Sequence, residues 1–201
     1  MSASLERKSL WILCALNASM FITEVGAGVV ADSMGLVADG LDMLADASVY
    51  GLALLAVGRP AREKIRAAFV AGYLQLALAI LATLKLLWAL LRGSDPEPIS
   101  MIGVSLLALS ANAAAIGILR RHRHGDVHIR AAWIFSATDV QVNLLVIVAA
   151  VLVLVLDSPI PDLAVGGVIC ALVFRSVWRI LSDARRTRAA LMPAPGEMRP
   201  G

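Results

Sequence analysis

The stretch VADGLDMLADASVYGLALLAVGR, Val37 to Arg59, places three aspartates inside a run that is apolar enough to cross a bilayer. A carboxylate near the bilayer centre costs about 3 kcal/mol or more unless a partner compensates it. Asp39, Asp42 and Asp46 fall within about 60° of one another on a helix, because successive residues turn by about 100°. The stretch therefore predicts a membrane helix with one acidic face, whose carboxylates need partners elsewhere in the fold.

The composition of the whole chain is that of a membrane protein. Its 201 residues are 59% hydrophobic and 16% charged, and the mean hydropathy is +0.80. Soluble domains are nearer to about half apolar and about a quarter charged. No basic patch interleaved with aromatic residues suggests a nucleic-acid partner. Cys14 and Cys170 each stand alone in an apolar run, so no disulfide framework is expected.

Apolar runs of membrane-spanning length recur along the sequence. A helix needs about 20 residues to cross about 30 Å of hydrocarbon. We expect helices near residues 10–30, 36–57, 67–91, 101–119, 131–156 and 162–181. The predicted fold class is an all-α integral membrane protein with six transmembrane helices in one domain, residues 1–184. The segment 185–201 ends rich in proline and glycine and is predicted to be a disordered cytoplasmic tail.

Positive charges gather on alternate connectors. They are Arg7 and Lys8, then Arg59, Arg62, Lys64 and Arg66, then Arg120, Arg121, Arg123 and Arg130, and finally Arg185, Arg186 and Arg188. The opposite connectors hold Arg92 beside five acids, Asp32, Asp95, Glu97, Asp157 and Asp162. The positive-inside rule then predicts a multi-pass protein of the inner (plasma) membrane with both termini in the cytoplasm.

A second polar stripe lies in the fifth expected helix. Asp139 is its acid, and Asn143 follows one turn later on the same face. Asp139 lies about 12 Å along that helix, while Asp42 and Asp46 lie about 9 and 15 Å along theirs. These four side chains could surround a cation with oxygen ligands, in a tetrahedral or larger shell. Without metal such a cluster takes up protons, and metal binding would release them, which gives a chemical basis for metal–proton exchange.

The sequence resembles the cation diffusion facilitator family. SMGLVADGLDMLADASVYGLAL is similar to the second helix of that family, S-x-x-L-x-A-D-x-x-[HD]-x-x-x-D, and HIRAAWIFSATDVQVNLLVIVAA to the fifth. PDLAVGGVICALVFRSVWRILSDA is similar to the Asp-containing entry into the sixth helix, so the resemblance covers residues 10–184. It implies metal ligands at Asp42, Asp46 and Asp139. It also implies a homodimer that exports divalent transition metals, usually in exchange for protons, by alternating access.

The sequence departs from the family pattern in two places. Phe135 stands where members often have His or Asp, so the fourth ligand is Asn143, a water molecule or absent. Many members also carry a cytoplasmic C-terminal domain, whereas this sequence ends at residue 201. We therefore expect a homodimer that forms through the membrane domain.

Several other polar residues admit more than one interpretation. Asp39 could serve an exit path or only form a hydrogen bond. Glu24 and Lys85 are interpreted as a structural ion pair, or Lys85 as snorkelling to the interface, in preference to a transport role. Asn17 and Asn112 are expected to form interhelical hydrogen bonds.

The connector RRHRHGDVHIR holds all three histidines, His122, His124 and His128. It is either a solvated basic loop, which we favour, or a weak cytosolic capture site that delivers metal toward Asp139.

The predicted function is export of a divalent cation, Zn²⁺, Fe²⁺, Co²⁺ or Mn²⁺, by proton-coupled antiport. Its partners would be the metal, the proton, the lipid bilayer and a second copy of the chain. Neither an enzymatic activity nor a prosthetic group is expected. The alternative is a non-transporting metal sensor or partner subunit with a degenerate site. A transporter of small organic cations is a third reading, and it would need a roomier, more aromatic cavity.

Overall fold

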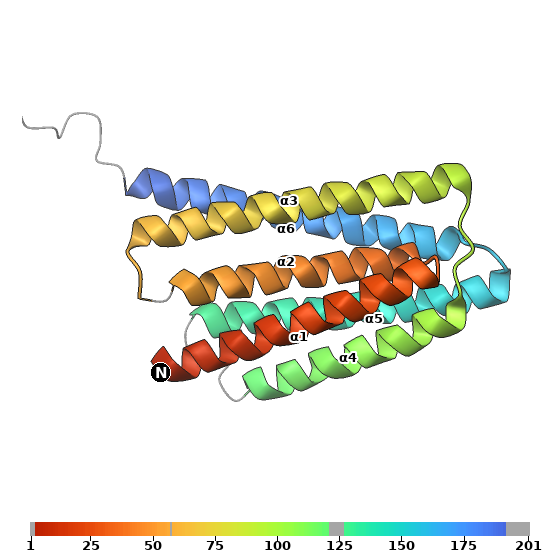
Figure 1. The fold of residues 1–201 in the computed structure, drawn as a ribbon, viewed down its shortest axis with the longest axis horizontal. Helices are drawn as coiled ribbons and strands as arrows, with labels where there is room; N and C mark the ends of the chain where they lie inside the picture. Colours follow the sequence, from red (N-terminus) through yellow and green to blue (C-terminus); the bar gives the residue numbers. More distant parts are fainter. Residues whose placement is uncertain (1–2, 57, 121–126, 192–201) are drawn as a thin grey trace, which may run out of the picture.

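The structure is a computed structural model that describes residues 3–56, 58–120 and 127–191. These residues form six α-helices that run back and forth along one long axis (Figure 1). They are α1 (Ala3–Val30), α2 (Met34–Ala56), α3 (Ala61–Arg92), α4 (Pro98–Arg120), α5 (Val127–Leu156) and α6 (Ile160–Ala190). Five of them, α1, α3, α4, α5 and α6, are long and apolar enough to cross a membrane.

The helices lie where the apolar runs predicted them, but several extend further. The largest difference is at α6, which continues to Ala190 instead of ending near residue 181. Residues 185–190, expected to begin a disordered tail, are therefore helical, because their alanines and arginines favour helix once a preceding helix is formed. Residues 192–201 lie outside the described part of the chain.

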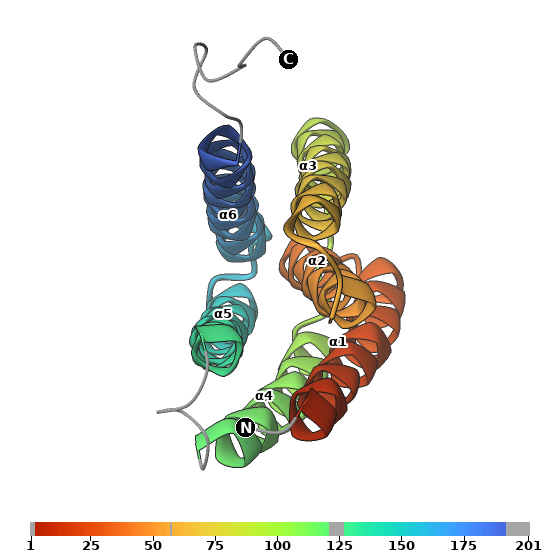
Figure 2. The same ribbon diagram turned by 90° about the vertical axis from the view of Figure 1, so that its left-hand side faces the viewer.

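The acidic helix α2 is the centre of the arrangement. It contacts each of the other five described helices. The most extensive pairings are α1 with α2, α4 with α5, and α3 with α6. Seen along the helix axes, α3 and α6 lie side by side at one end of the cross-section, and α1, α2, α4 and α5 fill the rest (Figure 2). The three aspartates thus lie on the helix that is most surrounded by protein.

Two glycines let α1 and α2 approach closely. A Cβ atom on Gly40 would lie 2.7 Å from Val25 Cγ2 and 2.9 Å from the Val25 backbone nitrogen. A Cβ atom on Gly28 would lie 2.9 Å from the backbone nitrogen of Val37. Small residues of this kind allow membrane helices to pack backbone against backbone.

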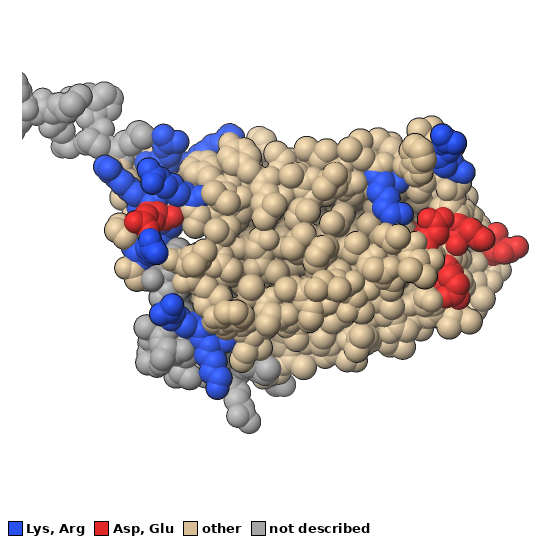
Figure 3. Space-filling model, in the orientation of Figure 1, with Lys and Arg blue, Asp and Glu red and all other residues tan. Residues whose placement is uncertain are grey.

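On the face shown in Figure 3, most Lys and Arg side chains gather toward one end of the molecule and most Asp and Glu side chains toward the other, with a largely uncharged belt between them. The basic end carries the described cations on the connectors and helix termini, Arg7, Lys8, Arg59, Arg62, Lys64, Arg66, Arg185, Arg186 and Arg188. The acidic end carries Asp32, Asp95, Glu97, Asp157 and Asp162. Lys85, which approaches Asp32, and Arg92, the last residue of α3, also lie toward this end.

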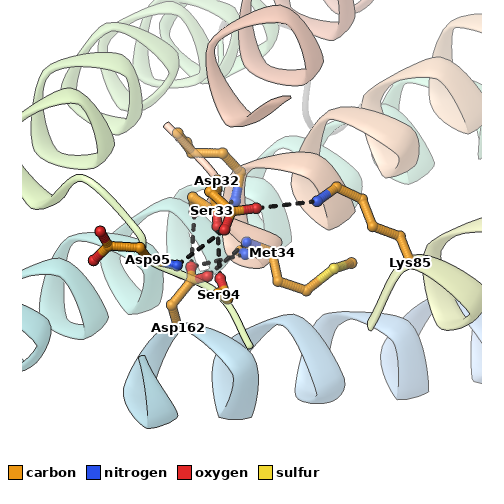
Figure 4. A network of polar contacts seen from close by, with 9 residues as sticks. Asp32, Ser33, Met34, Lys85, Ser94, Asp95 and Asp162 are labelled. Atoms are coloured by element: carbon orange, nitrogen blue, oxygen red, sulfur yellow. Dashed lines mark hydrogen bonds and ion pairs between the residues drawn. The ribbon is translucent and has the colours of Figure 1, made fainter. Parts of the chain in front are cut away.

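At the acidic end, Asp162 of α6 caps the start of α2 (Figure 4). Its carboxylate accepts hydrogen bonds from Ser33 Oγ at 2.7 Å, from the Met34 backbone at 2.5 Å and from the Gly35 backbone at 2.9 Å. The Ser33 hydroxyl in turn accepts one from the Leu36 backbone at 3.2 Å. The N–H groups that α2 cannot satisfy itself are thus paired, and the start of α2 is fastened to the start of α6.

The turn between α1 and α2 is fastened to the α3–α4 connector as well. Asp32, with φ of 48°, accepts hydrogen bonds from Ser94 Oγ and the Asp95 backbone, both at 2.9 Å. The Glu97 backbone donates to the Ala31 carbonyl at 2.8 Å. Lys85 Nζ lies 4.0 Å from Asp32 Oδ1 (Figure 4). The acidic end is therefore a closed network of polar contacts.

Candidate metal site

The acidic stripe of α2 points into the protein interior. Asp39 and Asp46 are buried, and Asp42 is half-buried. Asp46 lies twelve residues into α2, at a depth of about 18 Å from its start. Asp42 lies close to the side chain of Gln75, a buried residue of α3. Gln75 was not identified from the sequence, because an isolated glutamine in an apolar helix carries no motif.

The two polar residues of α5 are buried, as their spacing predicts. Asp139 is 5% exposed and Asn143 is 0% exposed. Asn143 Nδ2 donates to the backbone carbonyl of Asp139 at 2.8 Å, and its Oδ1 atom is buried without a hydrogen-bond partner. The Asp139 carboxylate lies close enough to Asp46 and Asp42 to be repelled by both. The structure thus brings the two predicted stripes into one region of the interior and leaves the Asn143 oxygen free to bind a cation.

The predicted ligands are neighbours but do not form a closed metal shell. Within the described ranges, no three carboxylate, imidazole or thiolate side chains converge tightly enough to hold a metal ion. Asp42 lies toward α3, near Gln75, on the side of α2 that also faces α6. The assignment of Asp42, Asp46, Asp139 and Asn143 as a metal site stays a prediction.

Glu24 differs from its interpretation as one half of an ion pair. It is 0% exposed, and neither of its carboxylate oxygens has a hydrogen-bond partner. Lys85 approaches Asp32 instead, at the acidic end. One signal was available in the sequence, since Glu24 is the single charged residue of the run 10–30. An acid in a membrane helix is by default a functional residue.

Other buried oxygen atoms lack partners in the same interior. Asn17 Nδ2 donates to the Leu13 carbonyl of its own helix at 2.9 Å, which leaves Asn17 Oδ1 unpaired. Both side-chain polar atoms of Asn112 and the Ser105 hydroxyl of α4 are also unpaired. The expected interhelical hydrogen bonds of Asn17 and Asn112 are thus not formed. Buried polar groups are normally satisfied, so these unpaired atoms are exceptions in the interior of the bundle.

The histidine connector and the side chain of Phe135 lie outside the described part of the structure. His122 and His124 lie outside the described residues, and His128 and Phe135 belong to α5 without described side chains. The roles of the histidine connector and of Phe135, at the position of the missing ligand, therefore stay predictions.

Comparison with known proteins identifies the family. Residues 10–187 match the cation efflux transmembrane domain. The chain is 30% identical over 194 residues to the zinc transporter ZitB of Pectobacterium atrosepticum, which covers 88% of this chain and 59% of that protein. It is 26% identical over 191 residues to the metal cation efflux system protein CzcD of Cupriavidus metallidurans, covering 89% and 60%. The chain spans about three fifths of the length of these relatives.

The match extends over most of the described helices, from α1 to α6, and includes the acidic stripes of α2 and α5. The chain therefore belongs to the cation efflux family, the cation diffusion facilitators, which are membrane transporters and not enzymes.

Proposed function

We propose that the protein exports a divalent transition-metal cation in exchange for protons. One observation carries the proposal: Asp46 and Asp139 are buried as neighbours inside the helix bundle, beside the unpaired oxygen of Asn143. Buried carboxylates are normally paired with a cation or bound to a metal. The membership in a family of cation transporters supports reading the missing partner as the transported ion.

The proposed topology has six spans, with α2 as the sixth membrane helix beside the five apolar ones. The basic end would face the cytoplasm, which places both termini there and the protein in the inner (plasma) membrane. A membrane helix with three aspartates is tolerable because α2 contacts protein on every side. We further propose a homodimer that forms through the membrane domain.

In this mechanism Asp42, Asp46, Asp139 and Asn143 bind the ion. Asp42 would have to turn from Gln75 toward the other ligands, so that ion binding closes the shell. Protonated carboxylates would lose their protons when the metal binds, and regain them when it leaves on the other side. Alternating access around the site would then couple metal export to proton entry.

The proposed ligand shell is made entirely of oxygen, which suits hard ions such as Mn²⁺. Affinity nevertheless rises from Mn²⁺ toward Cu²⁺ for a given site, and the similar ZitB protein of Pectobacterium atrosepticum is named as a zinc transporter. We therefore propose a broad exporter of Zn²⁺, Fe²⁺, Co²⁺ or Mn²⁺.

Asp42→His should narrow this range toward Zn²⁺, because an imidazole ligand disfavours Mn²⁺. Competition between Zn²⁺ and Mn²⁺ during uptake into proteoliposomes measures the change. A wild-type protein that is already strictly zinc-selective would show that these ligands do not set the selectivity.

The deciding experiment is metal-driven proton flux in proteoliposomes that contain the full chain. Wild type should move protons when Zn²⁺ is added, and Asp46→Ala should lose at least about 100-fold in rate, since it removes a direct ligand. Asp95→Asn, which removes an exposed acid from a connector, is the matched control and should keep full activity. Zinc binding without flux in the wild type would instead favour the non-transporting sensor.

A further inference from the structure

We propose that Glu24 and Asp39 form a second cation-binding site, between the central carboxylates and the acidic end of the bundle. This inference rests on the proposed export function, and the site would hold the same divalent ion one step closer to the exit.

The two residues meet where α1 and α2 pack most tightly. Glu24 Cβ lies 3.0 Å from the position that a Cβ atom on Gly40 would occupy, and Gly40 directly follows Asp39. The Glu24 carboxylate is near enough to repel the Asp39 carboxylate, and also those of Asp139 and Asp42 in the central cluster. Glu24 lies about 9 Å from the end of α1, and Asp39 about 8 Å from the start of α2. The two helices thus present one acid each at the same level.

Both acids are buried and have carboxylate oxygens without a hydrogen-bond partner. Glu24 is 0% exposed and Asp39 is 1% exposed. Both oxygens of Glu24 and the Oδ2 atom of Asp39 have no hydrogen-bond partner. Neither acid takes part in a salt bridge within the described part of the chain, where Lys85 approaches Asp32 and Arg59 pairs with Glu63. Buried carboxylates in this condition take up protons or bind a cation that enters the protein.

The chemistry of the pair selects a divalent cation. Two carboxylates carry a charge of −2, which one divalent ion neutralises, whereas a monovalent ion leaves one negative charge buried. The ligands are oxygens, as divalent ions of the hard and intermediate classes accept. Ser105 of α4 offers a further unpaired hydroxyl at about 10 Å from the start of its helix, a similar level. Water molecules would complete the shell.

The pair continues the acidic stripe toward the exit. Along α2, Asp46, Asp42 and Asp39 are separated by rises of about 6 and 4.5 Å. An ion released by Asp46 and Asp139 would reach Glu24 and Asp39 in short steps, without crossing an apolar stretch. The ion would therefore bind first to the central carboxylates and then to Glu24 and Asp39.

The test counts bound Zn²⁺ on the purified full chain by isothermal titration. We expect two ions per wild-type chain, one on Asp46→Ala, one on Glu24→Gln and none on the double variant. Glu24→Gln keeps the shape of the side chain and removes its charge. Asp157→Asn is the matched control, because it removes an exposed acid at the same end and asparagine tolerates its φ of 48°. It should bind two ions.

A second ion that persists on Glu24→Gln would overturn the inference, and so would a wild-type chain that binds a single ion lost on Asp46→Ala. If Glu24→Gln does not fold by circular dichroism, Asp39→Asn gives the same count from the other ligand. Failure of the proposed function is distinguishable: Asp46→Ala would then bind as many ions as wild type, while Glu24→Gln alone decides the second site.

Discussion

Two buried carboxylates near the acidic end of the molecule, those of Asp162 and Glu24, differ in their hydrogen bonding. At the start of α2, Asp162 is 0% exposed and accepts hydrogen bonds from Ser33, Met34 and Gly35. Two turns further into the bundle, Glu24 is equally buried and neither of its oxygens has a partner. Both acids lie in protein interior, so burial alone does not distinguish them.

The presence or absence of hydrogen-bond partners distinguishes an acid that stabilises the fold from one that is available to bind a ligand. A carboxylate that accepts several hydrogen bonds stabilises the fold, because its removal leaves buried donors unpaired. A buried carboxylate without partners destabilises the fold and is retained for another reason. The predictions that follow test this distinction through separate measurements of transport and stability.

The largest effect is expected for Asp139→Ala, on transport alone. Zinc uptake into proteoliposomes should fall at least about 100-fold, because a direct ligand is lost. The midpoint of thermal unfolding should change far less than in Asp162→Ala, since the Asp139 carboxylate is repelled by its neighbours Asp46 and Asp42. If Asp139→Ala is unfolded in the absence of metal, Asp139 is needed for stability as Asp162 is, and the prediction is wrong.

Asp162→Ala should act on stability first. It leaves the Ser33 hydroxyl and the N–H groups of Met34 and Gly35 without acceptors, which we expect to cost about 3 kcal/mol. Thermal unfolding in detergent micelles measures the loss, with Asp157→Asn as the control from the same connector. Equal unfolding midpoints for Asp162→Ala and wild type would show that the cap is not a main support of α2.

Gly40→Ala tests how much the close packing of α1 against α2 contributes to stability. Its Cβ atom would meet the Val25 backbone nitrogen at 2.9 Å, so α1 and α2 must separate. We expect a loss of about 1–3 kcal/mol, as for other overpacked sites. The same thermal assay checks it, and Gly103→Ala is the control, because a Cβ atom there would meet nothing within 4 Å.

The smallest effect concerns Glu97, an exposed acid that caps α4. The Ser100 hydroxyl and the backbone N–H groups of Ser100 and Ile99 hold the pKa of Glu97 below its usual value. A lowered pKa stabilises the fold above the unfolded value of about 4.3, and this contribution is lost as the pH falls through the lower folded value. Glu97→Gln should therefore be slightly less stable than wild type at pH 7, and the two should converge as the pH falls below the folded-state pKa of Glu97. A difference between the two unfolding midpoints that does not change with pH would contradict this assignment.

The sequence was sufficient for those features that depend on periodicity. The burial of Asp46, Asp139 and Asn143 follows from helix geometry and from the apolar runs around them. The helix ends were less predictable, since α6 continues through an arginine-rich segment that is not apolar. Local propensity and charge do not mark where such a helix stops.

The sequence could not predict which polar side chains contact each other between helices. Gln75 of α3 lies close to Asp42, and Lys85 approaches Asp32 instead of Glu24. Both contacts depend on how whole helices rotate against each other, which is decided by tight packing at positions such as Gly40. A pattern along one helix contains no information on the rotation of its neighbour.

The cap on α2 also has a consequence for biogenesis. Ser33 and Asp162 are separated by 129 residues, so α2 enters the membrane long before the ribosome has made its capping residue. Until α6 arrives, α2 has unpaired N–H groups at one end and three aspartates along one face. The newly made chain must therefore hold α2 against α1 during most of its synthesis, and the arrival of the last helix completes it.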